Sequence, residues 1–367
     1  MAVYKLFADR DAFINNQYST GNTGLDEILE LGNYQVAGYT YVARPLISFD
    51  SSEISDVLDN KVGTATFSSS LKLTYATAYE TPTTYSVNAY PVYDAWDEGV
   101  GKFGDSPINT TGVSWDFPLN DSSGSWDFPA GQGVTGSNSD VNLQGGSWYT
   151  GSNNISLEGT QTFVRDNEPD LDINVTNTVK AWYSGSITNN GFIVKFEDDL
   201  EFNDNLHIRH KFFSTDTNTI YPPVLEFKWD DSSYNTGSLN VLDTDQATIK
   251  VKNNRGNYIN EGKQRFRLTS RPTYPVRTFS TSSIYKVNYA LPANSYWALR
   301  DEFTEEMVID FDSEFTKISC DSNGPFFDIY MKGLQPERFY RVLIKSTLDG
   351  STTVIDNGSV FKVVRNG

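Results

Sequence analysis

The sequence predicts an all-β protein, and three observations support that prediction. Aromatic residues make up 14% of the chain, and they favour pleated, half-buried surfaces. Ser, Thr, Asn and Gly, which suit tight turns, fill much of the remainder. Segments of about four to eight residues that alternate in polarity, or are apolar throughout, follow one another between turn signals. Strands at such short spacing are typical of a sandwich or a barrel.

The strand-like segments fall into two series. The first series is 39–50, 61–79, 85–93, 154–164, 190–198, 205–215 and 223–229. The second series is 246–254, 264–270, 283–291, 307–313, 316–320, 325–334, 339–347 and 359–365. The second series has the strand number of an Ig-like sandwich. We therefore expect two successive β-domains.

Residues 24–33 and 51–60 predict short helices. In the first, Leu25, Ile28 and Leu29 recur at helical spacing, acidic residues occupy the first turn, and a glycine can end it. In the second, Ser51 or Ser52 is the expected N-cap, and apolar residues at 54, 57 and 58 share one face.

Length and charge divide the chain near residue 240. A chain of 367 residues exceeds the roughly 250 to 300 residues at which single cores stop growing. Residues 1–239 carry 12 Lys and Arg against 32 Asp and Glu, whereas residues 240–367 carry 17 against 15. We predict a first domain at 1–230, a polar linker at 231–238 and a smaller domain at 239–367.

The net charge of −18 also bears on partners. Phosphate backbones and anionic lipids would repel the acidic first domain. We therefore expect no nucleic acid and no membrane partner. The nearly neutral second domain can pack closely against other protein chains.

The sequence lacks the residues on which most catalytic and metal-binding sites depend. One Cys and two His exclude a disulfide framework and a zinc site of His and Cys ligands. His207 and His210 would point to opposite faces of a strand, so we expect them at an edge or rim. Nucleotide-binding and nucleophile motifs do not appear. The N-terminus shows no secretory signal, and no segment reaches the ~18 apolar residues of a membrane-spanning helix.

The segment 97–155 is predicted to be a long loop insertion that repeats the sequence SWDFP. Among its turn formers lie the candidate aromatic residues Trp115, Phe117, Trp126, Phe128 and Trp148. In one interpretation these rings anchor ordered loops to the core. In the other they are exposed binding platforms for a glycan or a neighbouring chain. The anchoring interpretation is favoured, with some rings facing a partner subunit.

Two acidic clusters are candidates for calcium, the cation that prefers about six to eight oxygen ligands. One consists of Asp166, Glu168, Asp170 and Asp172, and the other lies at 97–105. Neither matches a recognised calcium loop, and a solvated rim explains the same residues. A structural calcium ion is thus the one cofactor candidate. A glycoside hydrolase would require two carboxyl groups in a cleft, and no pair stands out among 47 acidic residues.

The segment LDINVTNTVKAWYSGSITNNGFIVKF (171–196), followed by FFSTDTNTIYPPVLEFKW (212–229), resembles the DNRLRE-type domain. The matching positions are Asp172, Val175, Thr176, Val179, Trp182, Asn190, Gly191, Phe192, Phe213, Ser214, Pro223 and Leu225. Upstream, RPLISFD (44–50) resembles an early core strand of that family, and WDEGVG with GVSW resembles its next stretch. The resemblance implies a jelly-roll β-sandwich over about residues 1–230, of a kind found in cell-surface proteins and phage particles.

Residues 295–346 are similar in texture to sandwich modules of tailed-phage structural proteins. The complete expectation is a jelly-roll β-sandwich followed by a smaller Ig-like β-sandwich, acting as a non-enzymatic head accessory, neck or tail protein. Its expected partners are other virion proteins and copies of itself, and its expected location is the virion, assembled in the host cytoplasm. Two alternatives remain open: a carbohydrate-binding or adhesin module that uses the Trp-rich loops on a surface glycan, and a polysaccharide-degrading tail enzyme.

Overall fold

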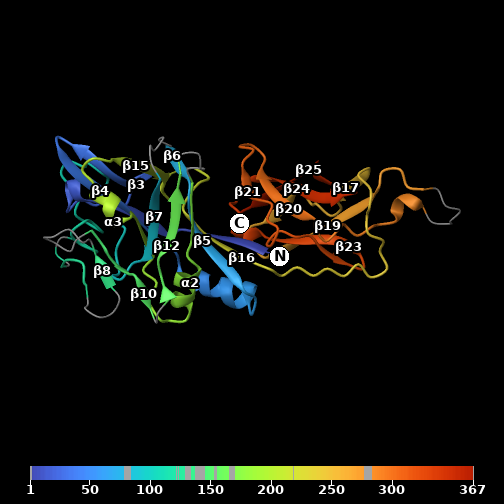
Figure 1. Ribbon diagram of the computed structural model, residues 1–367, viewed down its shortest axis with the longest axis horizontal. Coiled ribbons are helices and arrows are strands. Elements are labelled where there is room, and N and C mark those ends of the chain that lie inside the picture. Colours follow the sequence, from blue (N-terminus) through green and yellow to red (C-terminus); the bar gives the residue numbers. More distant parts are fainter. Residues whose placement is uncertain are drawn as a thin grey trace. The chain divides into compact units, whose positions relative to one another are not determined.

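A computed structural model describes most of the chain (Figure 1). The described residues are 2–77, 84–120, 122, 124–128, 134–136, 145–152, 155–164, 170–217, 219–276 and 283–366. They form mostly antiparallel sheets with a few short helices, which confirms the all-β fold class. Within these residues, no helix is long and apolar enough to cross a membrane.

Contacts divide the chain into two compact units. The N-terminal unit consists of Leu6–Gly63 and Ser68–Glu226. The C-terminal unit consists of Met1–Lys5, Thr64–Phe67 and Phe227–Gly367. The domain boundaries and linker drawn from the sequence stay a prediction.

Two sheets involve the strands up to residue 229. The larger has eight strands, in the order β12 (Gly159–Phe163), β7 (Tyr85–Pro91), β14 (Phe192–Phe196), β4 (Tyr39–Ser48), β3 (Ile28–Val36), β15 (Ile208–Phe213) and β6 (Tyr75–Thr77), with β2 (Arg10–Asn15) paired to β4. The smaller has the order β1 (Ala2–Phe7), β16 (Val224–Trp229), β5 (Phe67–Leu73) and β13 (Leu171–Asn174). Alternation sets the faces, because buried and partly exposed side chains succeed one another along β15. Two short ribbons, β8 (Val134–Gly136) with β9 (Ser147–Tyr149) and β10 (Gly151–Ser152) with β11 (Ile155–Ser156), complete this part.

The C-terminal unit contains two further sheets around one core. The first has the order β17 (Ala247–Val251), β19 (Lys263–Pro272), β23 (Gly324–Tyr330) and β22 (Ser319–Asp321). The second has the order β18 (Asn257–Ile259), β25 (Ser351–Val364), β24 (Phe339–Leu348), β20 (Tyr296–Asp301) and β21 (Met307–Ile309). Phe327 of the first sheet stacks between Phe266 and Trp297, with ring centroids 5.5 and 5.1 Å away. Since Trp297 belongs to the second sheet, aromatic rings join the two sheets into a sandwich.

The helix predicted at 24–33 is wrong. Residues 28–36 form strand β3, between β4 and β15. Leu29 and Leu31 are buried on one face, while Glu30 on the other pairs with Arg209 at 2.6 Å. A strand forms here, and not a helix, because hydrogen bonding to strands on both edges outweighs the helical spacing of three apolar residues.

The helix predicted near residue 51 is confirmed as α1 (Ser51–Val57), continued by η2 (Leu58–Val62). The expected N-cap, Ser51 or Ser52, is wrong. The cap is Asp50, whose Oδ1 accepts hydrogen bonds from the amides of Ser52 and Glu53 at 2.6 and 3.2 Å. Two helices were not predicted, α2 (Thr176–Tyr183) and α3 (Asp198–Glu201). The single-turn elements are η1 (Asn16–Tyr18), η3 (Ile284–Lys286) and η4 (Met331–Gly333).

Candidate functional site

The three loop tryptophans Trp115, Trp126 and Trp148 lie in the core of the N-terminal unit. They are buried in one apolar cluster with Leu46 of β4 and Ile193 of β14. Phe128 packs against the same cluster, and Phe117 is half-buried. A buried ring stabilises its loop by removing apolar surface from water, and its face is closed to a glycan. The geometry favours anchoring.

A buried ion pair holds these loops to the sheet. Arg44 on β4 donates from Nε and Nη2 to the two carboxylate oxygens of Glu201, each at 2.7 Å, and from Nη1 to the carbonyl of Gly145. Its guanidinium lies 4.7 Å from the ring centroid of Trp115 and 5.3 Å from that of Trp148. Because a buried charge is tolerated only when paired, Arg44 and Glu201 depend on each other.

Asn22 joins separate loop segments. Its Nδ2 donates to the carbonyls of Glu98 and Val113 at 2.7 and 2.9 Å. Gly99 and Gly112 pass so close that a Cβ on Gly112 would lie 2.4 Å from the Cα of Gly99, and both have positive φ. Only glycine fits such an approach, so the long loops are tightly packed where the structure describes them.

The predicted calcium ligands are only partly described. Asp166 and Glu168 lie outside the described residues. Oδ1 of Asp170 accepts a hydrogen bond from the amide of Tyr75 at 2.8 Å, and Asp172 pairs with Lys72 at 3.2 Å. The described part of the chain holds no group of three or more His, Cys, Asp or Glu that fits a metal ion. The calcium site stays a prediction.

The expectation of a rim position is wrong for His210. This residue is buried on β15, where its Nε2 lies 2.6 Å from the hydroxyl of Tyr85. Burial lowers the pKa of the imidazole to about 4. His210 shares a face with Ile208 and Phe212, and that face is the inner one. His207 precedes the strand and is exposed.

Carboxyl groups from four segments gather in the N-terminal unit. We call acidic cluster the set Asp9, Asp11, Asp26, Glu27, Glu98, Asp105 and Asp216. Hydrogen bonds join the segments: the amide of Asp11 donates to Glu98 at 3.0 Å, and the amide of Thr215 donates to Oδ2 of Asp11 at 2.7 Å. The cations beside the cluster include Lys102, paired with Glu27 at 2.6 Å, and Arg10, whose charge acts on Glu98.

Burial perturbs these carboxyl groups. It raises the pKa of Asp11 to about 7 and that of Asp26 to about 6. Burial also raises the pKa of Glu98 and Asp216. Asp11 is only 1% exposed, and its Oδ1 has no hydrogen-bond partner among the described residues. Desolvation penalises the charged form, so these four carboxyl groups hold their protons to a higher pH than exposed carboxyl groups do.

Apolar surface adjoins the acidic cluster. A pocket there is lined by Tyr18, Phe103, Ile108, Lys102 and Asp105, among others. The rings of Tyr18 and Phe103 meet edge to face at 5.2 Å. Ile108 is exposed, as are Leu25 and Val100 in neighbouring loops. Such a surface suits a partner that brings apolar side chains together with positive charge.

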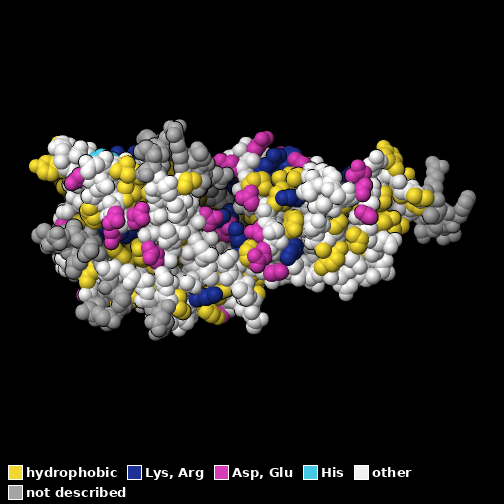
Figure 2. Space-filling view, in the orientation of Figure 1, with side chains coloured by type: hydrophobic (Ala, Val, Ile, Leu, Met, Phe, Trp, Pro, Cys, Tyr) yellow, Lys and Arg dark blue, Asp and Glu magenta, His cyan; other side chains and the backbone are white. Residues whose placement is uncertain are grey.

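The C-terminal unit exposes four apolar side chains on two adjacent limbs. We call apolar tip the residues Tyr274, Val276, Tyr285 and Val287; the first two are 79% and 84% exposed. One limb, residues 273–276, follows β19, and the other, residues 283–288, leads back to its end, where the amide of Tyr289 donates to the carbonyl of Ser270 at 2.8 Å (Figure 1, orange). Figure 2 shows hydrophobic side chains gathered over these limbs. Exposed apolar groups that cluster mark interaction sites.

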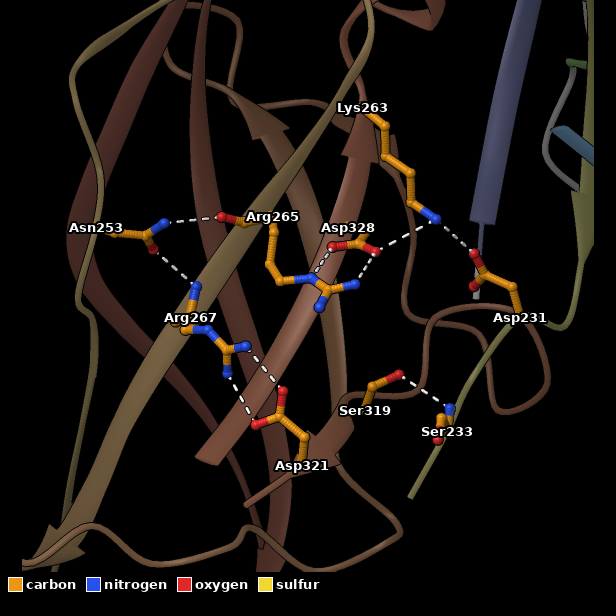
Figure 3. Close-up of polar contacts among 9 residues, drawn as sticks. All are labelled: Asp231, Ser233, Asn253, Lys263, Arg265, Arg267, Ser319, Asp321 and Asp328. Carbon is orange, nitrogen blue, oxygen red and sulfur yellow. Dashed lines mark hydrogen bonds and ion pairs between the residues drawn. The ribbon is translucent and has the colours of Figure 1, made fainter. Parts of the chain in front are cut away.

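An ion-pair ladder covers the outer face of β19. Lys263, Arg265 and Arg267 alternate along the strand, so they share one face. Figure 3 shows Arg265 and Arg267 reaching Asp328 and Asp321 at 2.8 Å. Burial acts to raise the pKa of Asp328, but the hydrogen bond from Arg265 and the charge of Lys263 outweigh it.

The ladder also fixes the chain at the start of the C-terminal unit. Lys263 bridges Asp328 and Asp231, at 3.3 and 3.0 Å (Figure 3). The amide of Ser233 donates to Oγ of Ser319 at 3.2 Å. Because its carboxylates neutralise the cations within the unit, the ladder stabilises the sheet and offers a partner little unpaired charge.

No protein-family model matches the chain, and no curated protein matches it. Sequence analysis singled out only the 97–105 part of the acidic cluster, as a calcium candidate, and it did not single out the apolar tip. A charge count in shorter windows would have pointed to the tip, since residues 246–300 carry ten Lys and Arg and one Glu. No local signal joins residues 97–105 to the carboxyl groups at 9–11, 26–27 and 216, because those come from distant segments.

Proposed function

We propose that this chain is a non-enzymatic structural component of a tailed-phage particle, acting through protein–protein contacts as a head accessory, neck or tail protein. The phage assignment rests on the resemblance of residues 1–230 to the DNRLRE-type domain and of residues 295–346 to phage sandwich modules. The contact-based mode of action is supported by one structural observation, the apolar tip.

The apolar tip supports an assembly role because exposure of its large apolar side chains to water is unfavourable. Tyr274 and Val276 are more exposed than any other large apolar side chain in the described part of the chain. Transfer of a side chain of that size out of water contributes about 1.5 to 3 kcal/mol. A rigid β-sandwich that presents such groups together gains this free energy only when another surface covers them.

Mass spectrometry of purified particles tests the proposal. The chain is expected at a defined copy number, and its absence would remove the proposed function. Particles assembled with Val276→Ser should incorporate fewer copies. Val354→Ser is the matched control, because Val354 is 52% exposed in the same unit but outside the tip, and it should leave incorporation unchanged.

Glycan binding by the Trp-rich loops is the alternative function. It would require the aromatic faces of those loops to be open, and Trp115, Trp126 and Trp148 are buried. No observation favours the third alternative, a polysaccharide-degrading enzyme.

A further inference from the structure

Two surfaces of this chain carry complementary chemistry, and the first is the apolar tip. Between Arg271 and Asn288 the sequence has no acidic residue. Arg271 lies 5.1 Å from the ring centroid of Tyr285, and Lys286 is exposed. Asp243 and Asp245 precede β17 next to the base of the limbs, but they do not belong to the limbs. The tip therefore combines apolar side chains with positive charge.

The second surface is the acidic cluster with its apolar border. Leu25, Val100 and Ile108 are exposed there, and the amide of Leu25 donates to the carbonyl of Gly101 at 3.0 Å, which joins two of the loops. Glu27, Asp105 and Asp216 lie around the same loops as Lys102. Asp9, Glu27 and Asp216 are exposed there, against the cations Arg10 and Lys102. The surface therefore has the opposite charge to the tip.

We infer that the apolar tip of one copy docks on the acidic cluster of a second copy, in a head-to-tail contact. The inference deepens the proposed function and rests on it, because it names a copy of the chain as the partner. The second copy is the occupant favoured by charge: residues 1–239 carry a net charge of −20, whereas residues 271–288 carry three Lys and Arg and no Asp or Glu. Opposite potentials speed encounter and fix orientation.

The arrangement of each surface fits the usual anatomy of an interface. Apolar side chains of the tip, Tyr274, Val276, Tyr285 and Val287, would cover the apolar border of the acidic cluster. Arg271 and Lys286 would meet carboxylates at the rim, where water still reaches them. Since the two contacting surfaces differ, the association is heterologous and forms either a ring or an open chain of copies.

The test measures the mass of the full-length chain in solution by light scattering after size exclusion, at low and high salt. At low salt the mass should rise with protein concentration, and at high salt it should fall toward that of one chain. A chain that stays monomeric at every concentration and salt overturns the inference.

Two variants locate the contact. Val276→Glu alters the tip and leaves the acidic cluster intact, whereas the double variant Val100→Ser with Ile108→Ser alters the border and leaves the tip intact. Each variant alone should be monomeric. Their mixture should give dimers of one copy each, because one intact tip can then meet one intact acidic cluster.

The controls separate this inference from misfolding and from the proposed function. Val354→Ser should associate as the unaltered chain does, and circular dichroism should show the same fold for every variant. Continued growth of both altered proteins, or a mixture that remains monomeric, overturns the head-to-tail contact. A chain that self-associates but is absent from particles contradicts the proposed function alone.

Discussion

Asp11 offers the sharpest test of the electrostatics of the acidic cluster. The change is Asp11→Asn, which keeps the shape of the side chain and removes its charge. Asp11 begins the buried part of β2, accepts a hydrogen bond from the amide of Thr215, and leaves Oδ1 without a partner among the described residues. The variant therefore loses a buried carboxylate and keeps the acceptor for Thr215.

The magnitude follows from the pKa of Asp11. Burial raises it from 3.8 to about 7, so the native state holds its proton more tightly than the unfolded state. The resulting contribution of Asp11 to the free energy of unfolding is fully present below pH 3.8 and is lost as the pH rises through 7. The pKa of about 7 lies about two units above pH 5. Since each unit corresponds to ~1.36 kcal/mol, the free energy of unfolding falls by at most about 2.7 kcal/mol between pH 5 and pH 8.

The assay is denaturant unfolding at pH 5 and pH 8, followed by tryptophan fluorescence. Trp96, Trp115, Trp126, Trp148 and Trp182 belong to the N-terminal unit, against two tryptophans in the other, so the signal reports mainly on the unit that contains Asp11. The compared quantity is the free energy of unfolding of the variant minus that of the unaltered chain, because other titrating groups cancel in this difference.

The difference should become more positive by about 1 to 3 kcal/mol between pH 5 and pH 8. Asp199→Asn, which changes an exposed carboxylate, should show no such change. A difference that is constant with pH, or that falls as the pH rises, would refute the assignment of a buried, high-pKa carboxyl group to Asp11.

Four further variants test predictions of stability. Arg44→Met should cost about 3 to 5 kcal/mol, measured by denaturant unfolding, because Glu201 is left buried without its main partner. Trp126→Ala should cost about 3 to 5 kcal/mol and should admit proteases to the loops, whereas Arg265→Ala, whose side chain is 47% exposed, should cost less than about 1 kcal/mol. His210→Phe should remove an acid-induced loss, because the pKa of His210 is lowered to about 4 and its stability is therefore lost as the pH falls below about 6.5.

The fold class followed from the sequence because strand periodicity is local. Alternation along 205–215 marked β15 correctly, yet it did not say which face was inner, and so His210 was placed at a rim. At 24–33 the spacing of Leu25, Ile28 and Leu29 suited a helix, and the pairing of β3 with two neighbours decided otherwise.

The candidate surfaces were harder to predict for a physical reason. Composition drew attention to Trp115 and Trp126, but it could not show that Trp115 lies against Arg44 of β4. The acidic cluster brings Asp11 next to Glu98 and Asp216. Such proximity is a property of topology, and a single sequence holds no trace of it.

The dependence of Arg44 on Glu201 has a consequence for synthesis. The two residues are 157 positions apart, and both SWDFP repeats leave the ribosome before Glu201 does. Until β14 and α3 have emerged, the indoles have no cavity to fill and the guanidinium no counterion. A nascent chain paused in this interval exposes apolar surface that favours aggregation. The N-terminal unit is therefore expected to fold only after its last strands are translated, and chaperones are expected to bind it until then.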